Sequence, residues 1–122
     1  ILPGMLQRQR GHIVNIGSAS GTKPISGETL YCASKYGVHG FSETLRLDCA
    51  DTPVRVTEVM PGMVRTNLAQ IRFDDAERAE QYYQDFGTCL LPEDVAETVA
   101  FAVRQPPHVV LSQLVVLPTS QA

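Results

Sequence analysis

The amino-acid sequence predicts an α/β fold built on a parallel sheet. Three short runs of mostly apolar residues, at 12–17, 54–60 and 109–117, are typical of buried strands. Helical patterns lie between these runs, and a helical crossover between consecutive strands makes the strands parallel. The 122 residues are enough for one domain at most, or for part of a larger one.

The first strand, expected over residues 12–17, lies between Gly11 and a small polar stretch, Ser18 to Gly21. β-Branched residues in a run of this length favour a strand, and small polar residues favour a loop. Pro24 and Gly27 continue that loop. Ligands bind at the carboxyl ends of the strands in open α/β sheets, so this loop is a candidate binding element.

Residues 29–50 are predicted to form the longest helix, because apolar residues recur at spacings of three and four. The residues on this helix face are Leu30, Ala33, Gly37, Phe41, Leu45 and Leu47. Gly37 and Gly40 each cost a helix about 1 kcal/mol relative to alanine. Two such residues indicate that the helix lies close to another backbone.

The second half of the chain repeats the alternation of strand and helix. Its elements are expected at 54–60 (strand), 76–83 (short helix), 92–104 (helix) and 109–117 (strand). Pro61-Gly62 ends the second strand, and residues 63–91 form a mixed excursion. Pro92 suits the first position of its helix, whereas Leu91 before it is a poor N-cap.

The composition excludes several classes of protein. The net charge is −3 without any run of Lys or Arg, so nothing favours a nucleic acid or an anionic membrane as partner. No apolar stretch approaches the roughly 18 residues that a membrane span needs. The three cysteines are widely spaced and the three histidines share no metal-ligand spacing. Both observations argue against a disulfide framework and a metal site, and they favour the reducing cytoplasm.

Tyr31 and Lys35, four residues apart at the start of the long helix, share one helix face. A lysine ammonium near a phenol lowers the pKa of the phenol, which can then exchange a proton with an alcohol or carbonyl near neutral pH. The pair alone is common, so its context matters. Ser18 follows the first strand and Pro61-Gly62 follows the second. These three elements therefore converge on one sheet edge, where a serine hydroxyl could bind a substrate oxygen.

Three segments in this order, GHIVNIGS at 11–18, YCASK at 31–35 and PGMVRT at 61–66, resemble the short-chain dehydrogenases/reductases. The resemblance covers essentially the whole chain. It implies a Rossmann-like, doubly wound parallel sheet, of which residues 1–122 form the C-terminal, catalytic half. It also implies an oxidoreductase that transfers a hydride between NAD(P) and a secondary alcohol or ketone.

The resemblance implies a role for each matching residue. Ser18 would orient the substrate, Tyr31 would be the catalytic acid and base, and Lys35 would lower the pKa of Tyr31. The residues that would bind the cofactor are Tyr31, Lys35, Pro61, Gly62, Val64 and Thr66. Residues 63–91 would form the substrate lobe.

Within the family, the sequence is most similar to the NADP-dependent 3-hydroxy acid (serine) dehydrogenases. The matching segments are Ile71-Arg72-Phe73, residues 91–96 and the tail at 117–121. The similarity implies a small 3-hydroxy acid such as serine as substrate, with Arg72 binding its carboxylate, and it favours NADP over NAD. It also implies a homotetramer that packs through the helix at 29–50.

In this family, a Gly-rich turn that follows a strand binds the cofactor pyrophosphate. None of the strands predicted here is followed by such a turn. Residues 1–122 alone are therefore expected to be inactive and not to form a stable monomer. Two other interpretations are compatible with the sequence: a non-catalytic polypeptide, and a 3-oxoacyl carrier protein reductase. Tyr82, Tyr83 and Phe86 could either contact the substrate or pack in the core. Arg65 is an alternative to Arg72 as the carboxylate ligand.

Overall fold

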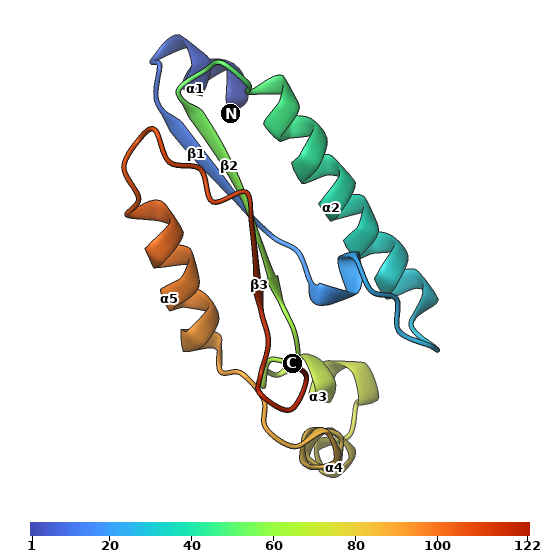
Figure 1. Cartoon of the computed structure of the whole chain (residues 1–122). Helices are drawn as coiled ribbons and strands as arrows, with labels where there is room; N and C mark the ends of the chain where they lie inside the picture. Colours follow the sequence, from blue (N-terminus) through green and yellow to red (C-terminus); the bar gives the residue numbers. More distant parts are fainter.

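The computed structural model describes all 122 residues and confirms the α/β fold (Figure 1). The elements are α1 (Leu2–Gln7), β1 (Gly11–Ile16), the 3₁₀ turn η1 (Ala19–Gly21), α2 (Thr29–Asp48), β2 (Val54–Pro61), α3 (Leu68–Phe73), α4 (Ala76–Phe86), α5 (Pro92–Val103) and β3 (Gln113–Val116). None of the helices is long and apolar enough to cross a membrane.

The three strands form one parallel sheet in the order β1-β2-β3. Gly11 lies opposite Val54 at the start of the β1–β2 ladder, and Glu58 lies opposite Gln113 at the start of the β2–β3 ladder. Helix α2 covers one face of the sheet and α5 the other, while α3 and α4 lie beyond the carboxyl ends of the strands (Figure 1). Helices on both faces leave β2 almost completely buried, so β2 is the centre of the domain.

The excursion between β2 and α5 contains a helix that the sequence does not predict, α3 (Leu68–Phe73). Six residues are too few to show a helical period, and Asp74 ends the helix in the left-handed conformation with φ of 49°. Helix α4 continues to Phe86, beyond the expected 76–83, and stops at Gly87, whose φ is 89°. Strand β3 is shorter than expected, because residues 109–112 make no ladder with β2.

Helix α5 begins where the sequence predicts, although Leu91 offers no capping side chain. The Oδ2 atom of Asp94 accepts a hydrogen bond from the Leu91 backbone N–H at 2.7 Å. An acidic residue in the third helical position therefore accepts a hydrogen bond from the backbone N–H of the N-cap residue.

The apolar face predicted for α2 points mainly away from the sheet. Leu30 is 86% exposed, Phe41 59% and Leu47 75%. Apart from the adjacent residues and the backbone of α2 itself, nothing in the chain lies within 4 Å of a Cβ built at Gly37 or Gly40. The close backbone contact indicated by these glycines is therefore not made within this chain, and α2 presents an apolar stripe to its surroundings.

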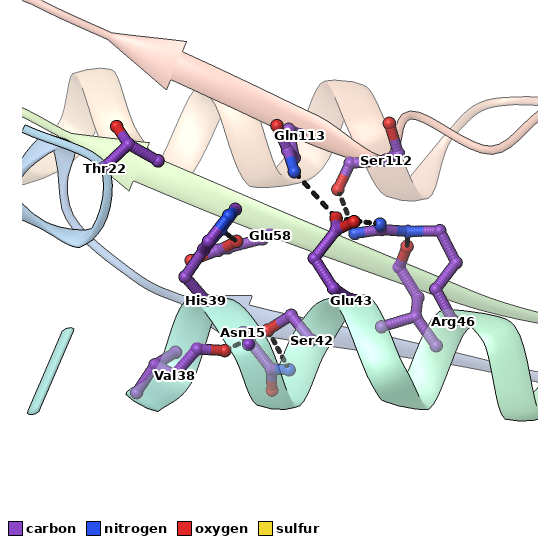
Figure 2. A network of polar contacts seen from close by, with 12 residues as sticks. Asn15, Thr22, Val38, His39, Ser42, Glu43, Arg46, Glu58, Ser112 and Gln113 are labelled. Carbon is purple, nitrogen blue, oxygen red and sulfur yellow. Dashed lines mark hydrogen bonds and ion pairs between the residues drawn. The ribbon is translucent and has the colours of Figure 1, made fainter. Parts of the chain in front are cut away.

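The inward face of α2 meets the sheet through polar contacts (Figure 2). The Ser42 hydroxyl accepts a hydrogen bond from Asn15 Nδ2 of β1 at 2.9 Å and donates one to the Val38 carbonyl at 2.7 Å. Arg46 donates to the backbone carbonyls of Val56 at 3.3 Å and Ser112 at 2.8 Å. These bonds link α2 to residues on or beside all three strands, so they fix where the helix lies along the sheet.

Glu58, in the middle of β2, is fully buried beneath α2. Its Oε2 lies 2.8 Å from His39 Nδ1, and its Oε1 has no hydrogen-bond partner (Figure 2). A Cβ at Gly17 would lie 2.2 Å from Oε1. The carboxylate therefore requires both the His39 side chain and a glycine where β1 ends.

The apolar core consists of two clusters of buried residues. The first, Cys49, Val54 and Val56, lies at the amino end of the sheet and packs against α1. The second, Ala69, Ala79 and Tyr83, lies inside the α3–α4 excursion. A separate cluster shows that the excursion is packed in its own right.

His39→Ala is expected to lower the free energy of unfolding by about 1–3 kcal/mol, because it leaves the buried Glu58 carboxylate without a partner. Urea unfolding of the full-length protein at neutral pH measures the change. His108→Ala is the matched control, since His108 is exposed and makes no hydrogen bond. Equal stability of the two variants would show that the His39–Glu58 contact contributes nothing.

Residues 1–122 expressed alone are expected to self-associate. One edge of β1 pairs with β2 and its other edge pairs with no strand. Ile16 on that strand is 49% exposed, and only 19 of the 122 residues are buried. An apolar open edge pairs readily with another chain. Size-exclusion chromatography with light scattering over a range of concentrations tests this, and a monomer at every concentration would contradict it.

Candidate active site

A cavity of about 670 Å³ lies at the carboxyl ends of β1 and β2, beside the start of α2 and the α3–α4 excursion. It is lined by all the residues to which the family resemblance assigns a role: Ser18, Tyr31, Lys35, Pro61, Gly62, Val64, Thr66 and Arg72. These residues are spread over 55 positions of the sequence, and the parallel topology brings them to one place.

Ser18 directly follows the ladder of β1 with β2. The last bond of this ladder runs from the Gly17 N–H to the Val59 carbonyl at 2.8 Å. The Ser18 side chain caps η1, because its Oγ accepts a hydrogen bond from the Ser20 N–H at 3.1 Å. Ser18 is only 6% exposed. The cap fixes the position of Oγ and uses it as an acceptor, so its proton remains available to a ligand in the cavity.

Tyr31 and Lys35 project from the first two turns of α2. Lys35 Nζ lies 5.8 Å from the centre of the Tyr31 ring and 3.4 Å from the Ile16 carbonyl oxygen, to which it donates. The Tyr31 side of the cavity is open, since this residue is 39% exposed. The ammonium group thus lies between the end of β1 and the phenol, where it can stabilise negative charge on either side.

The segment after β2 is held by a residue near the end of the chain. Gln121 Oε1 accepts a hydrogen bond from the Met63 N–H at 2.9 Å and lines the cavity. A Cβ at Gly62 would lie 2.1 Å from the same oxygen, so a larger residue there would displace the Gln121 side chain. The sequence gives no periodic signal for this contact, because it joins two loops 58 residues apart.

Thr66 is held by Tyr83 of α4. The Tyr83 hydroxyl donates to the Thr66 carbonyl at 3.0 Å and accepts from the Thr66 N–H at 3.3 Å. Tyr83 is buried, whereas Tyr82 is half-buried and packs edge-on against the Phe73 ring at 5.4 Å. Both tyrosines pack in the lobe and both line the cavity, and Tyr82 is the more exposed of the two.

Backbone hydrogen bonds close the base of the excursion. The Leu90 N–H donates to the Met63 carbonyl at 2.9 Å, and the Arg65 N–H donates to the Leu90 carbonyl at 2.8 Å. The two ends of residues 63–91 are thereby joined beside β2, and α3 and α4 form a lobe over one side of the cavity.

Arg72 of α3 is paired with Glu28, a residue for which the sequence predicts no role. Its Nη1 donates to Glu28 Oε1 at 2.7 Å, and Glu28 lines the same cavity. The Glu28 side chain is only 15% exposed. Arg65, the alternative carboxylate ligand, pairs instead with Glu80 of α4 and does not line the cavity.

Comparison with known proteins agrees with this geometry. Residues 1–77 match the family model described as short chain dehydrogenase. The chain is 43% identical over 124 residues to the NADP-dependent 3-hydroxy acid dehydrogenase YdfG of Escherichia coli K12, covering 100% of this chain and 50% of that protein. It is 42% identical to the protein of the same name in Salmonella typhi, with the same coverage.

Solved structures give the same result. The closed form of a serine dehydrogenase complexed with NADP⁺ matches with a TM-score of 0.93 and 44% identity, covering 99% of this chain and 49% of that one. The crystal structure of serine dehydrogenase from Escherichia coli matches with a TM-score of 0.79 and 38% identity, covering 99% and 46%.

The chain thus spans about half the length of the curated relatives it matches. Within that half, the match runs through the segments that line the cavity. Since the family model covers more than half of its residues, the chain belongs to the short-chain dehydrogenase family.

Proposed function

We propose that this chain is the catalytic half of an NAD(P)-dependent oxidoreductase that interconverts a small 3-hydroxy acid and its carbonyl product. The observation that carries the proposal is the single cavity lined by Ser18, Tyr31 and Lys35. NADP is the favoured cofactor, because the named relatives are NADP-dependent and one solved relative is complexed with NADP⁺.

The residues of the cavity suit a nicotinamide nucleoside. The volume lies within the range of about 300–1,000 Å³ that is usual for ligand sites. The segment at 61–66 would flank the nicotinamide ring, and Lys35 would donate hydrogen bonds to the ribose. When bound, the nicotinamide supplies the acceptor or donor of the hydride.

The chain's own residues would move the proton of the reaction. Ser18 donates a hydrogen bond to the substrate oxygen, and the Tyr31 oxygen takes the hydroxyl proton while the carbon–oxygen bond becomes double. The alcohol thus loses one proton to Tyr31 and one hydride. In the reverse direction Tyr31 returns the proton to the oxygen. Lys35 stabilises the charge of the phenolate in both directions.

Arg72 would bind the substrate carboxylate at the far side of the cavity. Guanidinium groups bind carboxylates with two parallel hydrogen bonds, and Arg72 lines the cavity on the lobe side. Tyr82 and Phe86, which also line the cavity, would cover the substrate. The names of the relatives, a 3-hydroxy acid dehydrogenase and a serine dehydrogenase, support this substrate class.

The proposed assembly is a homotetramer that packs through α2. Its exposed apolar residues and the open surface at Gly37 and Gly40 support a helix-to-helix contact with another subunit. Three free cysteines support the reducing cytoplasm as the compartment.

Tyr31→Phe in the full-length enzyme is expected to reduce kcat about 10²–10⁴-fold, because the phenylalanine cannot exchange the proton. Cofactor binding, measured by fluorescence titration, should survive. Tyr36→Phe is the matched control, because it removes one hydroxyl group from the same helix. The Tyr36 hydroxyl lies outside the cavity and donates to the Thr22 carbonyl. A kcat of Tyr31→Phe close to that of the control would overturn the assignment.

A substrate panel tests the acid specificity. The enzyme is expected to oxidise 3-hydroxy acids in preference to neutral alcohols of the same length, and Arg72→Gln should raise KM for the acids at least about tenfold through the lost charge-assisted hydrogen bonds. Arg78→Gln is the control, since Arg78 lies on the lobe but not in the cavity. Turnover of neutral alcohols alone would refute the substrate class.

A further inference from the structure

The Arg72–Glu28 ion pair joins the two sides of the cavity. Glu28 comes immediately before α2, Arg72 lies in α3, and the pair spans 44 positions of the sequence. No other hydrogen bond or ion pair connects the lobe at 63–91 with residues 17–35. The two charges therefore mark the place where the lobe meets the start of α2.

The charges that line the cavity are unevenly distributed. Lys35 is held beside Tyr31 and the end of β1, whereas Arg72 and Glu28 lie together where the lobe meets the start of α2. Glu28 is the only acidic side chain among the lining residues. The lobe side of the cavity thus presents one positive and one negative group to a ligand.

We infer that Glu28 is a specificity-determining residue, which binds the ammonium group of a 3-hydroxy amino acid while Arg72 binds its carboxylate. The inference rests on the proposed function and narrows its substrate class. A 3-hydroxy acid without an amine would satisfy Arg72 only, whereas an amino acid carries both complementary charges on one carbon.

Both partners have capacity for a second ligand. Arg72 gives one of its five N–H donors to Glu28, through Nη1. Glu28 accepts through Oε1, and its Oε2 takes part in no hydrogen bond. An amino acid can therefore bind without breaking the ion pair. The pair remains together and each member gains one opposite charge.

A plain hydroxy acid meets an unfavourable neighbour in the same place. Its carboxylate would lie beside the Glu28 carboxylate, which is 85% shielded from solvent and so weakly screened. Displacing Glu28 from Arg72 would instead leave a largely buried carboxylate without its partner. An ammonium on the substrate removes both penalties.

Tyr82 does not alter this charge balance. The half-buried phenol has its pKa raised by burial first and by the nearby Glu28 carboxylate second, so it stays neutral at physiological pH. It can donate a hydrogen bond but adds no second negative charge. Glu28 is thus the one group in the cavity that attracts a cation.

The test compares two substrate pairs that differ only in the amine: threonine with 3-hydroxybutyrate, and serine with 3-hydroxypropionate, each as all stereoisomers. The measured quantity is the ratio of kcat/KM for the amino acid to that for the plain acid, in the full-length enzyme. Wild type is expected to favour the amino acids. Glu28→Gln should lower this ratio at least about tenfold, the value of one charge-assisted hydrogen bond.

Glu80→Gln is the matched control, because it breaks an Arg–Glu pair of the same lobe outside the cavity and should leave the ratio unchanged. Glu28→Asp, which keeps the charge, should recover part of the preference. If Glu28→Gln does not fold, competitive inhibition of wild type decides: 2-aminobutyrate should inhibit more strongly than butyrate.

The outcomes separate the inference from the proposed function. An active Glu28→Gln enzyme with the wild-type ratio, or equal inhibition by the two unreactive acids, overturns the inference and leaves the proposed function intact. A wild-type enzyme that oxidises neither member of either pair overturns the proposed function, and the inference with it.

Discussion

The contact between helix α2 and the buried carboxylate of Glu58 determines where the parts of the site lie. Glu58 occupies the central strand, and His39, which holds it, is one helical turn beyond Lys35. The same carboxylate lies against Gly17, the residue before Ser18. One buried group therefore touches the helix that carries Tyr31 and Lys35 as well as the strand end that carries Ser18.

The lobe is fixed by a different kind of contact. Backbone bonds at Leu90 close its base, Tyr83 holds Thr66, and an apolar cluster fills the space between α3 and α4. The only hydrogen bond or ion pair that joins it to the other side of the cavity is Arg72–Glu28. A displacement of the lobe would break that one ion pair and leave the contacts inside the lobe intact, which suits a surface that must admit and release a substrate.

The sequence predicts the alternation of elements and the convergence of the site residues, because both depend on local signals. Tyr31 and Lys35 share a face by spacing, and Ser18 and Pro61 each follow an apolar run. Three features could not be predicted from local signals. Helix α3 is too short to show a period. Helix α2 turns polar residues toward the sheet and leaves apolar residues exposed, whereas a helix in a single chain usually buries its apolar face. The Arg72–Glu28 pair joins distant positions, and a charge pattern along the chain does not report such pairs.

The contact between Gly17 and Glu58 also limits how this protein can evolve. A side chain at position 17 would collide with the carboxylate, so it requires a smaller residue at position 58. That smaller residue would leave the His39 ring without its partner and open space beneath α2. Three positions, on a strand end, a central strand and a helix, are thus expected to change together or not at all, and homologues should show them as correlated substitutions.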